Sequence, residues 1–138
     1  MIETDMTIFF RQLASVAPNP ELSDEQLLTP LYNAYYAPES ITAEQNARTA
    51  DWLRELVQRW RSSGVSDASR IQSMNARNPK YVLRNYLAQQ AIDKAEQGDY
   101  DMIHELQAVL ENPYETQLND RNGRVTERVV RCYPVVRK

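Results

Sequence analysis

The sequence predicts an all-α protein, a bundle of about five to six helices followed by an irregular C-terminal tail. Only 3 of its 138 residues are glycine. Because left-handed turns, phosphate-binding loops and tight hairpins rely on glycine, this scarcity argues against sheet-rich and nucleotide-binding folds. Apolar residues recur at helical spacing between capping residues and prolines. At 42% hydrophobic residues the chain can bury one core. We expect residues 1–113 to form one helical domain and residues 114–138 to form the tail.

Three amphipathic segments are expected in the first half of the chain. The first runs from about Asp5, the N-cap, to Val16, and prolines follow it. The second opens at Ser23, and Pro30 predicts a kink or two short pieces. Its apolar face comprises Leu27, Leu28, Leu31, Tyr32 and Tyr35.

The third segment has the clearest start signal. Thr42 and Gln45 have capping-box spacing, and the helix is expected to end near Arg61, before Gly64. Its apolar stripe is expected to comprise Trp52, Leu56 and Trp60, joined by Leu53 and Val57. The two tryptophans suit a core or an interface better than a cofactor site.

Three further helices are expected in the second half. Ser66 should cap a short helix to about Ala76, with Ile71 and Met74 directed inward. Asn78 and Pro79 have the residue types of an N-cap and a first helical position, so a long helix is expected from there to Gly98. Asp99 should cap a last helix that Pro113 ends, and the last two helices should form an αα-hairpin.

Charge is distributed unevenly, although the formal net charge is only −3. From Arg48 to Arg84 there are eight basic and three acidic residues, whereas from Asn85 to Asn112 there are one basic and six acidic residues. The asymmetry would steer a partner, or it reflects ordinary solvated helix faces. Nothing in it predicts binding to nucleic acid.

Few residues of the sequence have the types and spacing of a catalytic or metal-binding site. His104, the only histidine, shares a helix face with Asp101 and Glu105, but acidic residues near a helix start are ordinary capping chemistry. Cys132, the only cysteine, lies between Arg131 and Tyr133 with no identifiable base nearby. We assign no catalytic, cofactor-binding or metal-binding residue.

One cluster of basic residues could form a binding site for an anion. Arg77, Lys80 and Arg84 surround the helix start expected at Asn78, where backbone N–H groups would favour an anion. A phosphate or an acidic partner would fit there. The alternative is that these side chains cap neighbouring helix ends or, for Arg84, belong to a buried polar network.

The compartment is expected to be the cytoplasm. A single cysteine excludes an internal disulfide framework and favours a reducing environment. The start, MIETDMTIFFRQL, does not resemble a signal peptide, and no apolar run reaches the length of a bilayer span. We therefore expect no membrane association.

Part of the chain resembles a known family. The run RNPKYVLRNYLAQQAIDKAEQGDY, the helix after it and then NPYE look like the C-terminal segment of the selenoprotein O family. DMTIFFRQLA near the start and RIQSMNARNPKYVLRN extend the similarity to roughly residues 5–115. The ending RVVRCYPVVRK departs from the family's closing Cys-Ser-Ser or selenocysteine motif, so no redox role transfers to Cys132.

The resemblance implies a piece of a larger enzyme. Selenoprotein O relatives have a protein-kinase-like fold, similar to pseudokinases, and use ATP and a divalent metal such as Mg²⁺ to transfer AMP to protein hydroxyl groups. Their nucleotide- and metal-binding positions have no counterpart in this sequence. The expected function is therefore a non-catalytic helical portion, and its partner is the rest of a kinase-like enzyme. The alternative is a stand-alone helical interaction module. A piece separated from the larger enzyme should expose an apolar face, which would promote self-association.

Overall fold

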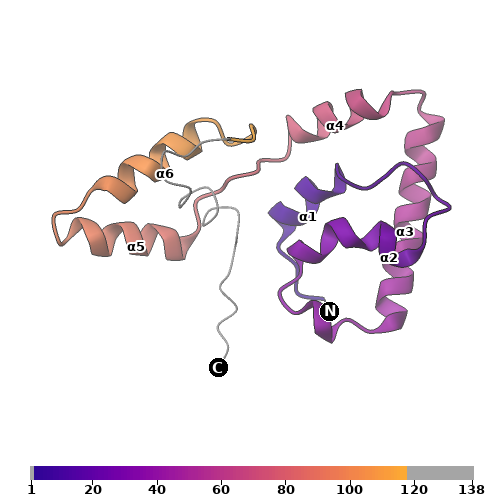
Figure 1. Ribbon diagram of the computed structural model, residues 1–138, viewed down its shortest axis with the longest axis horizontal. Helices are drawn as coiled ribbons and strands as arrows, with labels where there is room; N and C mark the ends of the chain where they lie inside the picture. Colours follow the sequence, from indigo (N-terminus) through magenta and orange to yellow (C-terminus); the bar gives the residue numbers. More distant parts are fainter. Residues whose placement is uncertain (1, 118–138) are drawn as a thin grey trace. The chain divides into compact units, whose positions relative to one another are not determined.

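A computed structural model describes residues 2–117 of the chain (Figure 1). These residues form six α-helices and two 3₁₀-helices, with no strand among them, so the all-α prediction is confirmed. The elements are α1 (Met6–Leu13), α2 (Asp24–Leu28), η1 (Thr29–Ala34), η2 (Pro38–Ser40), α3 (Ala43–Ser62), α4 (Asp67–Asn75), α5 (Asn85–Ala95) and α6 (Asp101–Glu111).

The chain divides into two compact units, residues 1–78 and residues 79–138. Each unit has its own hydrophobic cluster, where a single core was expected. The boundary at residue 113 stays a prediction, and most of the expected tail, including Cys132, lies outside the described residues. Within residues 2–117 no helix combines the length and the apolar character needed to cross a bilayer.

Local capping sets the helix starts of the first unit as predicted. The Asp5 side chain accepts the N–H of Ile8 at the start of α1. Ser23 and Thr42 each form a complete capping box, with glutamines three residues later. Pro30 divides the second segment into α2 and η1, since proline cannot supply a helical N–H.

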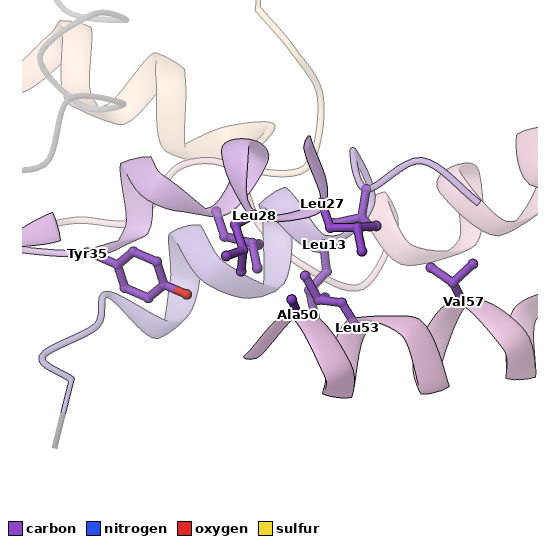
Figure 2. Close-up of a cluster of buried hydrophobic side chains, with 9 residues drawn as sticks. Leu13, Leu27, Leu28, Tyr35, Ala50, Leu53 and Val57 are labelled. Carbon is purple, nitrogen blue, oxygen red and sulfur yellow. The ribbon is translucent and has the colours of Figure 1, made fainter. Parts of the chain in front are cut away.

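The core of the first unit lies between α3 and the short helices before it. Here α1 packs against η1, and α2 packs against α3 (Figure 2). The buried side chains are Leu13, Val16, Leu27, Leu28, Leu31, Tyr35, Ala50, Leu53 and Val57.

The buried face of α3 is narrower than expected and is rotated from the predicted stripe. Ala50, Leu53 and Val57 are 0% exposed, whereas Trp52 is 45% exposed and Trp60 lies at the edge of the core. Both stripes are apolar at helical spacing, so periodicity alone did not distinguish them. The small side chain at Ala50 allows closer packing than an indole would.

The second unit begins differently from the prediction. Asn78 does not cap a helix; its side-chain amide donates to the carbonyl of Met74 at 2.9 Å. The backbone N–H groups of Lys80 and Tyr81 both donate to the carbonyl of Pro113, at 2.8 and 3.2 Å. With Tyr81 also buried, these tertiary contacts hold residues 79–84 outside any helix, and the expected start at Asn78 was wrong.

The predicted αα-hairpin is confirmed (Figure 1). Gly98 adopts φ +86°, which a residue with a side chain rarely does, and it separates α5 from α6. The Asp99 side chain accepts the N–H of Asp101 at 3.1 Å, while Tyr100 occupies the cap position itself. The hairpin buries Tyr81, Leu87, Ala91, Met102, Leu106 and Val109.

Truncation of a central core residue should destabilise the first unit. Because Leu53 is fully buried, we expect Leu53→Ala to lower the free energy of unfolding by about 2–5 kcal/mol through lost transfer energy and a cavity. Urea titration followed by tryptophan fluorescence measures this. Gln58→Ala, an exposed change on the same helix, should stay within about 0.5 kcal/mol. Equal effects would contradict the assigned core.

The first unit should lose stability at high pH. Burial raises the pKa of Tyr35 above its ordinary value of 10.0, and neighbouring Tyr32 raises it further. The folded state therefore favours the neutral phenol, so this stability is fully present below pH 10 and is lost as the pH rises through the folded pKa. Tyr35→Phe should remove this part of the decline in urea unfolding at pH 9–11. Tyr100→Phe, which removes an exposed hydroxyl, provides the reference, and identical profiles for Tyr35→Phe and the parent would refute the assignment.

Candidate functional site

The structure does not assemble a site around the only histidine of the sequence. His104, Asp101 and Glu105 are all exposed on α6. Among residues 2–117, no three His, Cys, Asp or Glu side chains are grouped to hold a metal ion.

The predicted anion site does not form as expected. No helix begins at Asn78, so the N–H groups that were to bind the anion are engaged elsewhere. Arg77 donates to the hydroxyl of Ser73 at 2.6 Å and to its carbonyl at 3.2 Å, at the end of α4. Lys80 donates to the hydroxyl of Thr116 at 3.3 Å. The plainer alternative, that the basic residues bind helix ends, is confirmed for Arg77.

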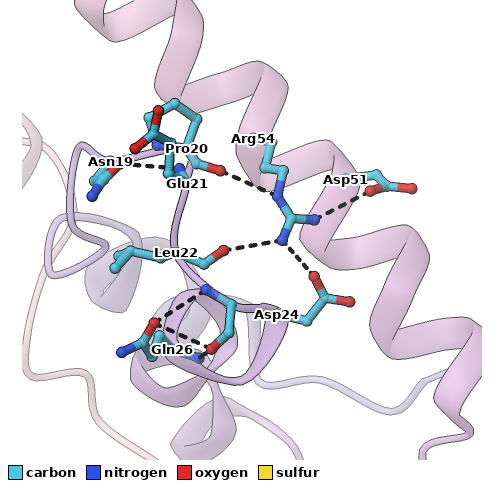
Figure 3. A network of polar contacts seen from close by, with 9 residues as sticks. Asn19, Pro20, Glu21, Leu22, Asp24, Gln26, Asp51 and Arg54 are labelled. Carbon is cyan, nitrogen blue, oxygen red and sulfur yellow. Dashed lines mark hydrogen bonds and ion pairs between the residues drawn. The ribbon is translucent and has the colours of Figure 1, made fainter.

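A polar network fastens α3 to the loop before α2 (Figure 3). Arg54 donates to the carbonyls of Pro20 and Leu22, at 3.3 and 3.1 Å, and to the carboxylates of Asp24 and Asp51, at 2.5 and 3.3 Å. The hydrogen bond with Asp24 is the main reason that the pKa of Arg54 is raised. The guanidinium therefore stays charged and joins two segments about 30 residues apart in sequence.

A second arginine, Arg70 on α4, is buried although its neighbours Ile71 and Met74 were expected to be the inward residues. Its guanidinium donates to Asp67 at 2.5 Å and to the carbonyls of Ala14 and Val16 at 3.5 and 3.4 Å. It also lies 4.0 Å from the ring centroid of Trp60. This combination of cation–π and carbonyl contacts connects α4 with the end of α1 and with α3.

Replacement of Arg70 by lysine should destabilise the first unit even though the charge is kept. A lysine has one ammonium group and lacks the planar fork that reaches Asp67, the carbonyls and the indole together. We expect Arg70→Lys to cost about 1–3 kcal/mol in the free energy of unfolding. Arg61→Lys, at an exposed position of α3, should be neutral within about 0.5 kcal/mol. A neutral Arg70→Lys would show that the network does not stabilise the fold.

The first unit also carries exposed aromatic side chains. Phe10 is 46% exposed and contacts Phe9 edge-on at 5.8 Å, and Phe9 lies 6.2 Å from Trp52. Next to Trp52 is a shallow hollow of about 380 Å³, lined by Ile2, Gln45, Arg48, Thr49 and Trp52. We call Phe10, Trp52 and this hollow the aromatic surface.

The second unit carries a larger hollow between its two helices. The α5–α6 groove has a volume of about 500 Å³ and a largely apolar lining. Its residues are Leu83, Ala88, Ala91, Ile92, Ile103, Leu106, Gln107, Leu110 and Glu111. Two of these side chains, Ile92 and Ile103, are 49% and 39% exposed. An apolar groove of this kind fits a peptide or helix better than a charged metabolite.

Comparison with known proteins identifies relatives of the sequence. The chain is 41% identical over 117 residues to the protein nucleotidyltransferase YdiU of Flavobacterium johnsoniae, covering 85% of this chain and 22% of that protein. It is 49% identical to the namesake from Tolumonas auensis, over 83% of this chain and 21% of that protein. The protein of the same name from Rhodopirellula baltica is 41% identical, with 85% and 23% covered.

The chain thus spans about a fifth of the length of the curated relatives it matches. No protein-family model matches the sequence, and no solved structure matches it either. The resemblance noted from the residues alone is confirmed, because identities of 41–49% extend over most of this chain. The chain is a homologue of a segment of the YdiU protein nucleotidyltransferases, the selenoprotein O family.

Proposed function

We propose that this chain acts as a non-catalytic helical portion of a selenoprotein O-like protein adenylyltransferase in the cytoplasm. In the whole protein, AMP would pass from ATP to hydroxyl groups of acceptor proteins, and the remaining part would bind the ATP and Mg²⁺. The proposal rests chiefly on one observation: high identity over more than four-fifths of this chain corresponds to only about a fifth of each relative.

The aromatic surface supports a role in binding the rest of such an enzyme. Phe10 and Trp52 are each nearly half exposed and lie on two different helices whose positions the core fixes. Aromatic side chains bury large areas at interfaces and contribute disproportionately to binding energy. A rigid helical unit that presents them would position a neighbouring lobe without contacting the reacting atoms.

A chimera with a relative tests this role. Replacing the matching segment of the Tolumonas auensis protein with this chain should retain AMP transfer from labelled ATP to an acceptor protein, whereas deleting the segment should abolish it. Within the chimera, Trp52→Gln should weaken transfer by about tenfold, the equivalent of about 1.4 kcal/mol at the interface. Val65→Gln, at an exposed position of the same unit, provides the matched control.

Two outcomes would contradict the proposal. Robust AMP transfer by this chain alone, with ATP, Mg²⁺ and acceptor protein, would show that it is itself catalytic. A folded chimera that binds ATP but does not transfer AMP would show that this segment cannot replace its homologue. The second outcome would favour the alternative of a stand-alone helical protein-interaction module, which the aromatic surface would equally serve.

A further inference from the structure

The α5–α6 groove lies open among the described residues, and the same chain contains a segment whose chemistry matches it. We propose that residues 118–138 of this chain dock in the α5–α6 groove. The proposal concerns an intramolecular contact and does not depend on nucleotidyltransferase activity.

The groove presents an apolar strip to whatever covers it. Leu83 is 52%, Ile92 is 49% and Ile103 is 39% exposed, while Ala91 and Leu106 form its buried base. The two helices bury Ala91 and Leu106 where they pack on each other, whereas Ile92 and Ile103 lie on a second, exposed apolar face. Burial of isoleucine and leucine side chains against an apolar occupant would lower the free energy by removing their surface from water.

Residues 118–138 supply apolar side chains of suitable size. The segment contains five valines and one leucine, distributed along its length as Leu118, Val125, Val129, Val130, Val135 and Val136. Among them, Val129 and Val130 are adjacent, as are Val135 and Val136.

Charge complementarity favours the same occupant. Residues 85–112, which form the hairpin, contain six acidic residues and one basic residue, Lys94, and Lys94 is already within 3.8 Å of Asp99. Residues 118–138 contain six basic and two acidic residues. Glu111 lines the groove itself. Opposite charges on the two segments would steer the contact and strengthen it at low salt.

The last described residue, Gln117, is held near one end of the groove. The side-chain amide of Gln117 donates to the carbonyls of Val109 and Asn112, at 2.8 and 3.1 Å, and its N–H donates to the hydroxyl of Tyr81 at 3.1 Å. The segment is therefore tethered at the end of α6, next to the groove residues Leu110 and Glu111.

The tether also gives this segment an advantage over a second copy of the chain. A span of 21 residues can reach roughly 70 Å when extended, whereas α6, with 11 residues, is only about 16 Å long. A short tether produces an effective concentration of the order of mM, far above the concentration of free chains in a dilute sample. Even a segment with weak affinity for the groove would therefore bind the groove of its own chain rather than that of a second copy.

Paramagnetic relaxation enhancement on the full chain tests the proposal. Cys132, the only cysteine, accepts a nitroxide label without any mutation, and the methyl signals of Ile92, Ile103 and Leu110 report on the groove. We expect these signals to weaken relative to the sample reduced with ascorbate, and to recover partly in 1 M salt, where the Debye length falls to about 3 Å.

Matched variants and isotope mixing make the outcome decisive. Ile103→Glu places a charge in the groove and should restore the methyl signals of Ile92 and Leu110. His104→Glu introduces the same side chain at an exposed neighbouring position outside the groove and should leave these signals weakened. If the signals weaken only when labelled and isotope-enriched chains are mixed, a second copy is the occupant and the proposal fails. Undiminished groove signals in the labelled full chain would overturn it as well.

Discussion

Burial of one narrow face of α3 is the constraint on which the first unit depends. With 20 residues, α3 is about 30 Å long, yet only its Ala50–Leu53–Val57 face is completely enclosed. The elements packed around it are short: α2, which packs against α3, has five residues, and η1, which packs against α1 and α2, has six. Helices of that length are not stable alone in water, so their conformation depends on packing against α3 and α1. The shorter helices therefore depend on tertiary contacts for their stability.

Arginine side chains donate hydrogen bonds to backbone carbonyl groups that this packing leaves without a partner in a helix. Arg54 and Arg70 donate to four carbonyls in the connection between α1 and α2, and Arg11 donates to two more at and after the end of α4. The connection after α1 contains Pro18 and Pro20, which lack N–H groups, so regular backbone pairing cannot satisfy that stretch. A guanidinium provides several donors in one plane and can bridge such carbonyls while its charge is matched by aspartates. Two of the basic residues in the middle of the sequence, Arg54 and Arg70, therefore have structural roles.

Features that depend on a few neighbouring residues could be predicted from the sequence, and features that depend on tertiary contacts could not. The helix start at Ser23 and the capping box at Thr42 depend on residues at most three positions apart, and both form as predicted. Asn78 and Pro79 give an equally good local signal, but hydrogen bonds from the following residues to the distant carbonyl of Pro113 override it. The same limit applies to the candidate site. Helical periodicity showed that the last two helices are apolar, but it did not show which apolar face the hairpin would bury and which would form the groove.

A pair of helices has only one mutual face, and this explains why the second unit presents a groove. Both helices of the hairpin carry apolar residues over a wider arc than their contact can cover, as Ile92 and Ile103 show. Compact domains normally enclose such a surface with a further layer, and among residues 79–117 no third helix is present to do so. The covering group must therefore come from elsewhere in this chain or from another protein. A segment already attached at Gln117 loses less translational freedom on docking than a separate molecule does. If residues 118–138 dock as proposed, an external partner must displace them before it can bind the groove.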